Sequence, residues 1–434
     1  MDLGAALAFL DSHVNLEALP AREVGALSRR QGRMQRLVAL LGDPQDACPV
    51  VHLTGTNGKT STARMVTALL AAKGLSVGTY TSPHLERVNE RIAWNGDPIG
   101  DGALVEVVET LAAVETAVEE RPSYFELLTA GAFRWFADVA VDVAVVEVGL
   151  GGRWDATNVA DATVAVVTNV SLDHVDYLGR DVEAIAREKA GIVKPGCHLV
   201  LGETTPEVAA LFRAAGAAEV WARDEHFGCE QNRLAHGGRL LDLRTPGAAY
   251  DDVYLPLHGA HQGDNAAVAL ATAEAFFDGP LDTDVVEEAL ASVTSPGRME
   301  VMTRHPLCLL DGAHNPAGAR SAALTIAEEF SDVAGRWLVV GMMVERDPIE
   351  LLDALEARSA RGVVACAADS PRALPAPAVA AAARGLGVEA EVAGSVPEAV
   401  ARALALAGPD DLVLVTGSLY VVGAARAALR AGVG

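Results

Sequence analysis

Residues 50–60 read VVHLTGTNGKT, and this stretch indicates the class of fold. Its first part, Val50–Thr54, is rich in apolar and β-branched residues and predicts a buried parallel strand. The Ala- and Leu-rich segment Lys59–Lys73, followed by Gly74, predicts a helix with a glycine at its end. A buried strand that leads through a tight loop into a helix is the repeating unit of α/β folds.

The loop between this strand and this helix, Gly55–Lys59, favours phosphate binding. Two glycines allow the backbone N–H groups to turn toward an anion, and the helix N-terminus adds partial positive charge. Lys59 can reach the β- and γ-phosphates, and the Thr60 hydroxyl can bind Mg²⁺. The full G-x4-GK[ST] consensus is not met, because its first glycine would fall at Leu53. An ordinary strand-to-helix turn is the alternative, but both flanking elements favour an ATP site made by Gly55, Thr56, Asn57, Gly58, Lys59, Thr60 and Ser61.

The same alternation of strand and helix recurs along the chain. Strands are expected at 50–54, 141–148, 163–168, 337–341, 362–366 and 412–416. Helices are expected at 59–73, 101–119, 125–138, 181–191, 262–277, 316–330 and 348–358. This order predicts an α/β protein, with a P-loop ATPase domain built on a doubly wound parallel sheet and a smaller Rossmann-like α/β domain after it.

The length of 434 residues predicts two or three domains, at roughly 100–200 residues per domain. The segment SVTSPGR at 292–298 lies between an acidic helix and a new strand–helix series, so we expect a domain of residues 1–295 and a second of 296–434. Residues 227–256 contain short alternating runs instead, and we expect an antiparallel flap there.

Composition excludes several classes of protein. The 34 basic and 58 acidic residues give a net charge of −24, which disfavours general binding to nucleic acids and anionic membranes. No apolar run approaches the roughly 18 residues of a membrane span, and Asp2 is unlike the basic start of a signal peptide. The five cysteines are scattered without a CxxC pair, which is typical of reduced thiols in a cytoplasmic protein.

A second glycine-rich loop follows another predicted strand, with the sequence EVGLGGRWD at 147–155. A dinucleotide fingerprint would require glycine where Trp154 stands. Glu147 falls at the carboxyl end of its strand, where ligands bind in open α/β sheets, and is a candidate Mg²⁺ ligand or general base. The alternative is a glutamate that caps a helix or pairs with Arg153.

These motifs together resemble the Mur ligase superfamily and, within it, the folylpolyglutamate synthase/dihydrofolate synthase family. The resembling segments are TGTNGKTST (54–62), TSPHLERVNER (81–91), YFELLTA (124–130), EVGLGGRWDATNV (147–159), SLDHVDYLG (171–179), AREKAGIV (186–193), HGAHQGDNAA (258–267), PGRME (296–300), DGAHNP (311–316) and TGS (416–418). Only 58 residues precede Lys59, too few for a strand and the roughly 90-residue UDP-sugar domain of peptidoglycan ligases.

The resemblance implies ATP-dependent amide formation. A folate or dihydropteroate carboxylate would attack the γ-phosphate to give an acyl phosphate, and L-glutamate would then displace phosphate. It implies two Mg²⁺ ions, leaves a monovalent cation open, and suggests a monomer without nucleic-acid or membrane partners. Two alternatives remain at this point: a related ligase for a non-folate carboxylate, and a nucleotide-binding regulator without turnover.

The resemblance also assigns roles to residues of the large domain. It implies catalytic roles for Lys59, Glu147, His174 and Lys189. Metal ligands would be Thr60, Ser82, Glu147 and His174, with Lys189 acting as a ligand once carbamylated. Alternatively, His174 is a core or capping histidine, and Lys189 is a helix-end lysine paired with Glu183 or Glu188.

The remaining roles fall on both sides of an expected cleft that closes around ATP. Asn265, Arg298 and Asp311 would contact the nucleotide, and His314 and Ser418 would bind glutamate. Phe125, Glu126, Arg153, Trp154 and Asp155 would line the pterin site. Asn315 and Pro316 could instead merely begin the following helix, as Asn before Pro often does.

Overall fold

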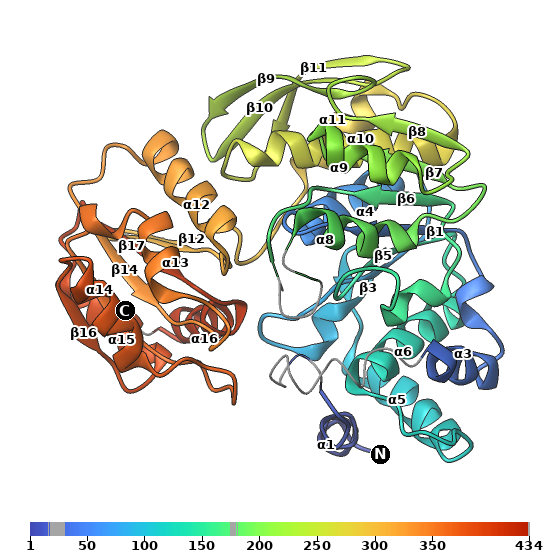
Figure 1. The fold of residues 1–434 in the computed structure, drawn as a ribbon, viewed down its shortest axis with the longest axis horizontal. Coiled ribbons are helices and arrows are strands. Elements are labelled where there is room, and N and C mark those ends of the chain that lie inside the picture. Colours follow the sequence, from blue (N-terminus) through green and yellow to red (C-terminus); the bar gives the residue numbers. More distant parts are fainter. Residues whose placement is uncertain (16, 18–30, 174–178, 180, 433–434) are drawn as a thin grey trace.

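The computed structural model describes residues 1–15, 17, 31–173, 179 and 181–432. Within these residues the chain forms two α/β units and a small antiparallel sheet (Figure 1). The large unit holds an eight-stranded sheet in the order β4-β3-β2-β5-β1-β6-β7-β8. Its strands are β1 (Val50–Thr54), β2 (Val77–Tyr80), β3 (Ile92–Trp94), β4 (Asp97–Pro98), β5 (Val143–Glu147), β6 (Val164–Val167), β7 (His198–Leu201) and β8 (Glu219–Ala222).

Six of these strands run parallel, and the short strands β3 and β4 are antiparallel at one edge. The central strand β1 is buried along its whole length and pairs with β5 on one side and β6 on the other. Its carboxyl end therefore lies beside the carboxyl ends of both neighbours, where open parallel sheets bind ligands.

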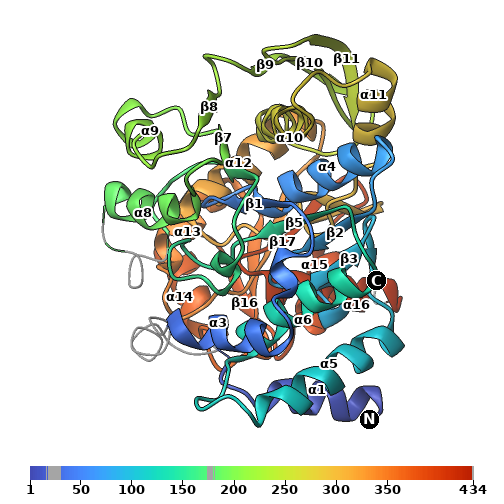
Figure 2. The same ribbon diagram turned by 90° about the vertical axis from the view of Figure 1, so that its right-hand side faces the viewer.

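Helices cover both faces of this sheet (Figure 2). One face packs against α4 (Lys59–Ala72), α10 (His261–Phe277) and α11 (Thr283–Ala291). The other packs against α1 (Leu3–Asp11), α3 (Gln31–Leu40), α5 (Asp101–Glu115) and α6 (Tyr124–Asp138). Near the edge formed by β7 and β8 lie α8 (Val182–Lys189) and α9 (Pro206–Arg213).

The small antiparallel sheet has the order β11-β10-β9, from β9 (Gly228–Ala235), β10 (Gly238–Arg244) and β11 (Ala249–Leu255). Its inward side chains, such as Leu241, Val253 and Leu255, join the core formed with α10 and α11. Its other side chains are largely exposed, which explains the alternating sequence pattern of this stretch.

The second unit is a six-stranded sheet in the order β12-β13-β17-β14-β15-β16, with only β12 antiparallel among its described strands. The strands are β12 (Glu300–Arg304), β13 (Leu307–Leu310), β14 (Arg336–Val340), β15 (Gly362–Ala365), β16 (Ala390–Val392) and β17 (Leu412–Thr416). Helices α12 (Pro316–Glu329), α13 (Pro348–Ala354) and α14 (Ala376–Gly385) cover one face, and α15 (Val396–Leu406) and α16 (Leu419–Arg430) cover the other.

The predicted fold class is confirmed, and β1 and β17 have the predicted bounds. Two helices end four residues earlier than predicted. Helix α5 ends at Glu115, and α13 ends at Ala354 because Glu356 takes a left-handed conformation with φ 54°. None of the helices in the described ranges is long and apolar enough to cross a membrane. All five cysteines are free thiols.

Candidate active site

A cavity of about 450 Å³ lies between the two units, at the carboxyl ends of β1, β5 and β6. The large unit contributes the glycine loop, the end of β5, the segment after β6 and the start of α10. The small unit contributes the segment after β13 and the first turns of α12. Of the predicted residues, the lining includes Gly55, Thr56, Asn57, Gly58, Lys59, Thr60, Ser61, Ser82, Glu147, Lys189, Asn265, Arg298, Asp311 and His314.

The glycine loop is held in one conformation by its neighbours. A Cβ atom at Gly55 would lie 1.9 Å from the Thr168 hydroxyl oxygen, so only glycine allows this approach. Gly58, the N-cap of α4, has φ 83°, and a Cβ there would lie 2.5 Å from Asn265 Oδ1. Both glycines are therefore required, one by packing and the other also by its backbone conformation.

Two lysines meet at the glycine loop. Lys59 Nζ donates to the carbonyl oxygens of Gly55 and Thr56, at 3.0 and 3.3 Å. Lys189 Nζ, from the end of α8, donates to the Gly55 oxygen at 2.7 Å. Burial, together with the charge of Lys59, lowers the pKa of the Lys189 amine to about 7. Lys189 is 4% exposed and points into the site, while Glu183 pairs with Arg187 instead.

Glu147 lies opposite the first turn of α4. The Thr60 hydroxyl donates to its two carboxylate oxygens at 3.1 and 3.0 Å. Burial raises the pKa of the Glu147 carboxyl, opposed by the charge of Lys59, the Thr60 hydrogen bond and a backbone hydrogen bond from Ser82. A carboxylate and two hydroxyl-bearing residues are thus brought together, and these are hard oxygen donors of the kind that Mg²⁺ prefers.

The nucleotide candidates outside the loop lie on the other walls. Asn265 comes from the first turn of α10, and its amide donates to Gln262 Oε1 at 3.0 Å. Asp311 follows β13 and accepts from the backbone N–H groups of Met299 and Ala313. Burial raises the pKa of the Asp311 carboxyl, although the nearby Arg298 guanidinium opposes this.

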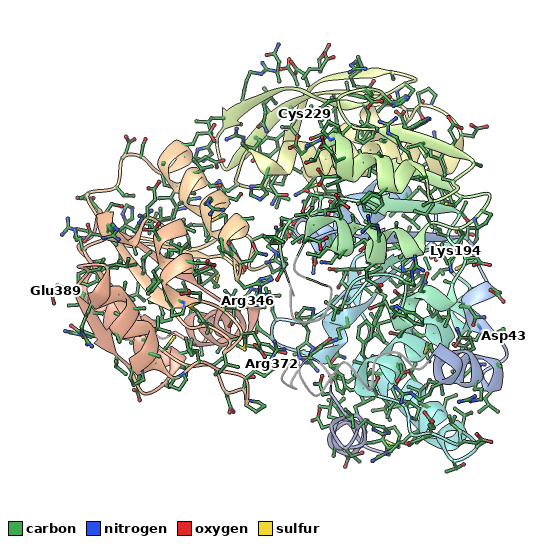
Figure 3. All side chains as sticks on the ribbon, viewed as in Figure 1. Asp43, Lys194, Cys229, Arg346, Arg372 and Glu389 are labelled. Carbon is green, nitrogen blue, oxygen red and sulfur yellow. The ribbon has the colours of Figure 1, made fainter. Side chains whose placement is uncertain are left out.

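A polar contact crosses the cavity at Asp173, which follows β6 and is 5% exposed. Its carboxylate accepts from Asn315 Nδ2 at 3.0 Å and pairs with Arg346 Nη1 at 2.5 Å, and His314 Nε2 lies 3.6 Å away. Arg346 lies on the side of the small unit that faces the large one (Figure 3). Three small-unit side chains therefore converge on one buried carboxylate of the large unit.

Asn315 both caps a helix and contacts the glycine loop, and these are the two roles that the sequence left open. Its side-chain oxygen accepts from Gly318 N at 2.8 Å and caps α12, with Pro316 as the first helical residue. Its amide nitrogen also reaches Asn57 Oδ1 of the glycine loop at 3.1 Å. The cap fixes the side chain in a position from which it bridges the two units.

The sequence analysis assigned no role to four acidic or arginine side chains of this cavity and its rim. Asp173 and Arg346 make the contact across the cavity described above. Arg223 lies after β8 and pairs with Asp264, which stands beside Asn265 in α10. Asp173 and Asp264 fall inside quoted motifs and could have been considered, whereas no local pattern marks Arg223 or Arg346.

Other predicted residues lie elsewhere or have structural partners. His174 lies outside the described residues. Ser418 is buried and caps α16 by accepting from Val421 N, and it is absent from the cavity lining that the described residues form. The predicted pterin residues are also absent from this lining, as far as the chain is described.

Those pterin candidates gather around the loop after β5. The Phe125 ring packs beside Gly149, where a Cβ would lie 2.6 Å from its Cζ. Glu126 closes a capping box with Ser123 and pairs with the buried Arg33. Asp155 accepts from the backbone of Leu150 and Thr157, while Trp154 is 40% exposed. Glu126 and Asp155 thus already hold the local backbone.

Comparison with known proteins identifies Mur ligase domains and related ligases over most of the chain. Residues 53–273 match the Mur ligase middle domain, and residues 297–419 match the Mur ligase glutamate ligase domain. A dihydrofolate synthase/folylpolyglutamate synthase of Mycobacterium tuberculosis is 42% identical over 91% of this chain and 88% of its own.

Solved structures agree with this match. Mycobacterium tuberculosis folylpolyglutamate synthase complexed with ADP superposes with a TM-score of 0.90, at 41% identity, over 98% of each chain. A folylpolyglutamate synthase complexed with AMPPCP and folate gives 0.84, at 32% identity, over 98% of this chain and 99% of that one. The chain belongs to the folylpolyglutamate synthase/dihydrofolate synthase family of Mur ligases, which are ATP-dependent ligases.

Proposed function

We propose that this ligase adds L-glutamate to the carboxylate of a folate, and that it also accepts dihydropteroate. One observation carries the proposal: the phosphate loop, the Glu147–Thr60 pair and His314 line a single cavity between the two units. ATP and an amino acid can therefore meet a third substrate in this cavity. Closure of the two units around the substrates would strengthen electrostatic interactions and exclude water from the reacting acyl group.

In the first step, a substrate carboxylate oxygen attacks the γ-phosphorus and ADP leaves, which yields an acyl phosphate. Lys59 is assigned to the transferring phosphoryl group, because its Nζ lies within the loop and can exchange the Gly55 and Thr56 oxygens for phosphate oxygens. In the second step, the neutral amine of glutamate attacks the acyl carbon and inorganic phosphate leaves. Positioning and charge neutralisation account for most of the catalysis in such transfers.

Thr60, Glu147 and Ser82 are assigned to Mg²⁺, together with His174. When bound, Mg²⁺ neutralises charge on the phosphate oxygens. The oxygen donors of Thr60 and Glu147, which lie about a hydrogen bond apart, support this assignment. Lys189 is assigned to a second Mg²⁺ after carbamylation. Carbamylation needs a neutral amine. Because the pKa of the Lys189 amine is lowered to about 7, a large fraction of it is neutral near neutral pH.

The assigned substrate residues lie partly on the lining of the cavity and partly outside it. The nucleotide is assigned to Gly55–Ser61, Asn265, Arg298 and Asp311. Glutamate is assigned to His314 and Ser418 at the small unit. The pterin is assigned to the region of Phe125, Glu126, Arg153, Trp154 and Asp155. The free thiols at all five cysteines support a reducing compartment, so we assign the enzyme to the cytoplasm. We also propose that it acts as a monomer.

The test measures phosphate release and product mass with ATP and L-glutamate, in parallel reactions that contain tetrahydrofolate or dihydropteroate. We expect the product mass to increase by one glutamate residue with either pterin. If no phosphate is released with either pterin, the folate assignment is overturned. If phosphate is released with tetrahydrofolate but not with dihydropteroate, the proposed dihydropteroate activity is refuted. Lys59→Ala should abolish turnover, whereas Lys73→Ala, at the other end of α4, should not.

A further inference from the structure

The loop that carries Ser82 belongs to the large unit but packs into the small one. It runs from β2 to β3, and Leu85 near its centre joins the apolar cluster of the small unit formed by α15, α16 and the face of the sheet beneath them. These contacts connect a proposed metal ligand of the large unit to the small unit.

Helix α16 approaches this loop at backbone distance. Gly423 is buried in the helix, and a Cβ there would lie 2.0 Å from the Leu85 carbonyl oxygen. Gly297, in the segment between the units, faces the same leucine, and its Cβ would lie 3.1 Å from Leu85 Cδ1. Because Gly423 has no side chain, the backbone of the loop packs directly against α16 at this position, which we call the seat of the loop.

Charges reinforce the seat one turn further along α16. Arg426 is 8% exposed, and its guanidinium bonds both Glu86 of the loop and the carboxylate of Glu300, which it reaches at 2.9 and 3.0 Å. Arg430 lies 3.5 Å from the same Glu86 carboxylate. The guanidinium therefore links the Ser82 loop to the start of the small-unit sheet.

Hydrogen bonds hold the loop at both ends, so we expect a displacement of Leu85 or Glu86 to displace Ser82 as well. The Glu90 carboxylate accepts from the backbone N–H groups of Leu85, Glu86 and Arg87, at 2.8, 3.1 and 2.9 Å. At its other end, the backbone of Ser82 is hydrogen-bonded to Glu147. Between these anchors lie only two residues, Pro83 and His84.

We propose that Gly423 and Arg426 are positioning residues for the ligase reaction: by seating the Ser82 loop, helix α16 sets the geometry of the metal and γ-phosphate site. The site is then complete only when the small unit is docked on the large one, which ties phosphoryl transfer to the presence of the glutamate-side domain. This inference rests on the proposed role of Ser82 as a Mg²⁺ ligand.

The first experiment compares Gly423→Ala with Gly385→Ala. Both glycines lie in helices of the small unit, but a methyl group at Gly385 meets no described atom within 4 Å. We expect Gly423→Ala to lower kcat by about 10- to 100-fold, as displacements near 1 Å do, and to raise the Mg²⁺ concentration for half-maximal rate. Without turnover, Gly423→Ala should also weaken the binding of Mg²⁺ with AMPPCP measured by calorimetry. Gly385→Ala should behave as the wild type. Thermal unfolding of both variants fixes a temperature at which each is folded.

A second pair of variants decides the matter if Gly423→Ala does not fold. Arg426→Gln and Glu86→Gln should each raise the Mg²⁺ requirement, the double variant should be no worse than either, and Arg426→Lys should recover part of the rate. An unchanged Mg²⁺ requirement in folded Gly423→Ala and Arg426→Gln would overturn the inference. Ser82→Ala is measured separately, because an unchanged Mg²⁺ requirement in that variant would refute the role of Ser82 itself.

Discussion

Lys189 donates a hydrogen bond from Nζ to the carbonyl oxygen of Gly55 at 2.7 Å and so joins the end of α8 to the phosphate loop. The same amine is buried beside Lys59, and both conditions disfavour a charge on it. A lysine in this state is a reactive amine at neutral pH as well as a structural contact.

The first prediction concerns stability and pH. In the folded state the Lys189 pKa is lowered to about 7, while in the unfolded chain it returns to about 10.5. Between these values the unfolded state binds more protons, so stability should rise with pH in this window. Thermal unfolding should show this rise in the wild type relative to Lys189→Met. Lys73→Met, which removes a lysine paired with Asp282, should keep the wild-type slope.

The second prediction concerns carbamylation. A neutral Lys189 amine attacks carbon dioxide and loses a proton, which converts a cation into an anion able to bind Mg²⁺. Removal of bicarbonate should therefore lower kcat, its return should restore kcat, and labelled bicarbonate should give a carbamate signal by NMR. An equal response to bicarbonate in Lys189→Met would refute this assignment.

The third prediction concerns the phosphate loop. Gly58→Ala should cost about 1–2 kcal/mol in backbone strain, because φ is 83°, and should also displace Asn265. ATP binding measured by calorimetry should weaken markedly. Gly74→Ala has a similar φ of 95° but meets no atom within 4 Å in the described chain, so it should cost strain alone and leave ATP affinity intact.

The fourth prediction concerns Glu147. Burial raises the pKa of its carboxyl, and only the ionised form binds Mg²⁺, so at limiting Mg²⁺ the rate should fall on the acid side at a higher pH than an ordinary glutamate would give. Excess Mg²⁺ should move this fall to lower pH, because metal and proton compete. Glu147→Gln should lower kcat by about 10²–10³-fold. Glu391→Gln, in an exposed pair with Arg402, is the control.

The fifth prediction concerns the contact across the cavity. Arg346→Ala removes the guanidinium that pairs with the buried Asp173 carboxylate and should cost up to about 3 kcal/mol of stability. Because His314 lies at the same carboxylate, the KM for glutamate should rise more than the KM for ATP. Arg402→Ala should change neither KM. Equal effects on the two KM values would contradict the proposed location of glutamate.

The sequence could predict those features that depend on local pattern. Val50–Thr54 and Leu412–Thr416 are continuous buried strands, and their composition alone determined their bounds. Short edge strands such as β3 and β4 were not predicted, since two or three residues carry no periodic signal. The end of α13 was not predicted, because it depends on the left-handed conformation of Glu356, and a glutamate in the sequence does not indicate that conformation.

The candidate site divides in the same way. The positions of the glycine loop and of Glu147 were predictable, because the loop follows one recognisable strand and Glu147 ends another. Asp173 and Arg346 are separated by 173 positions in the chain, and Glu86 and Arg426 are separated by 340 positions. Neither pair has a sequence pattern of its own.

The sequence by itself determined the fold class, the phosphate loop and the family, because strand–loop–helix order and motif spacing are properties of neighbouring residues. Only the tertiary structure decided which carboxylates lose water, which amine becomes neutral, and where the small unit seats the Ser82 loop. Burial and distance between remote segments set these properties, and both arise only when the two sheets have formed and docked.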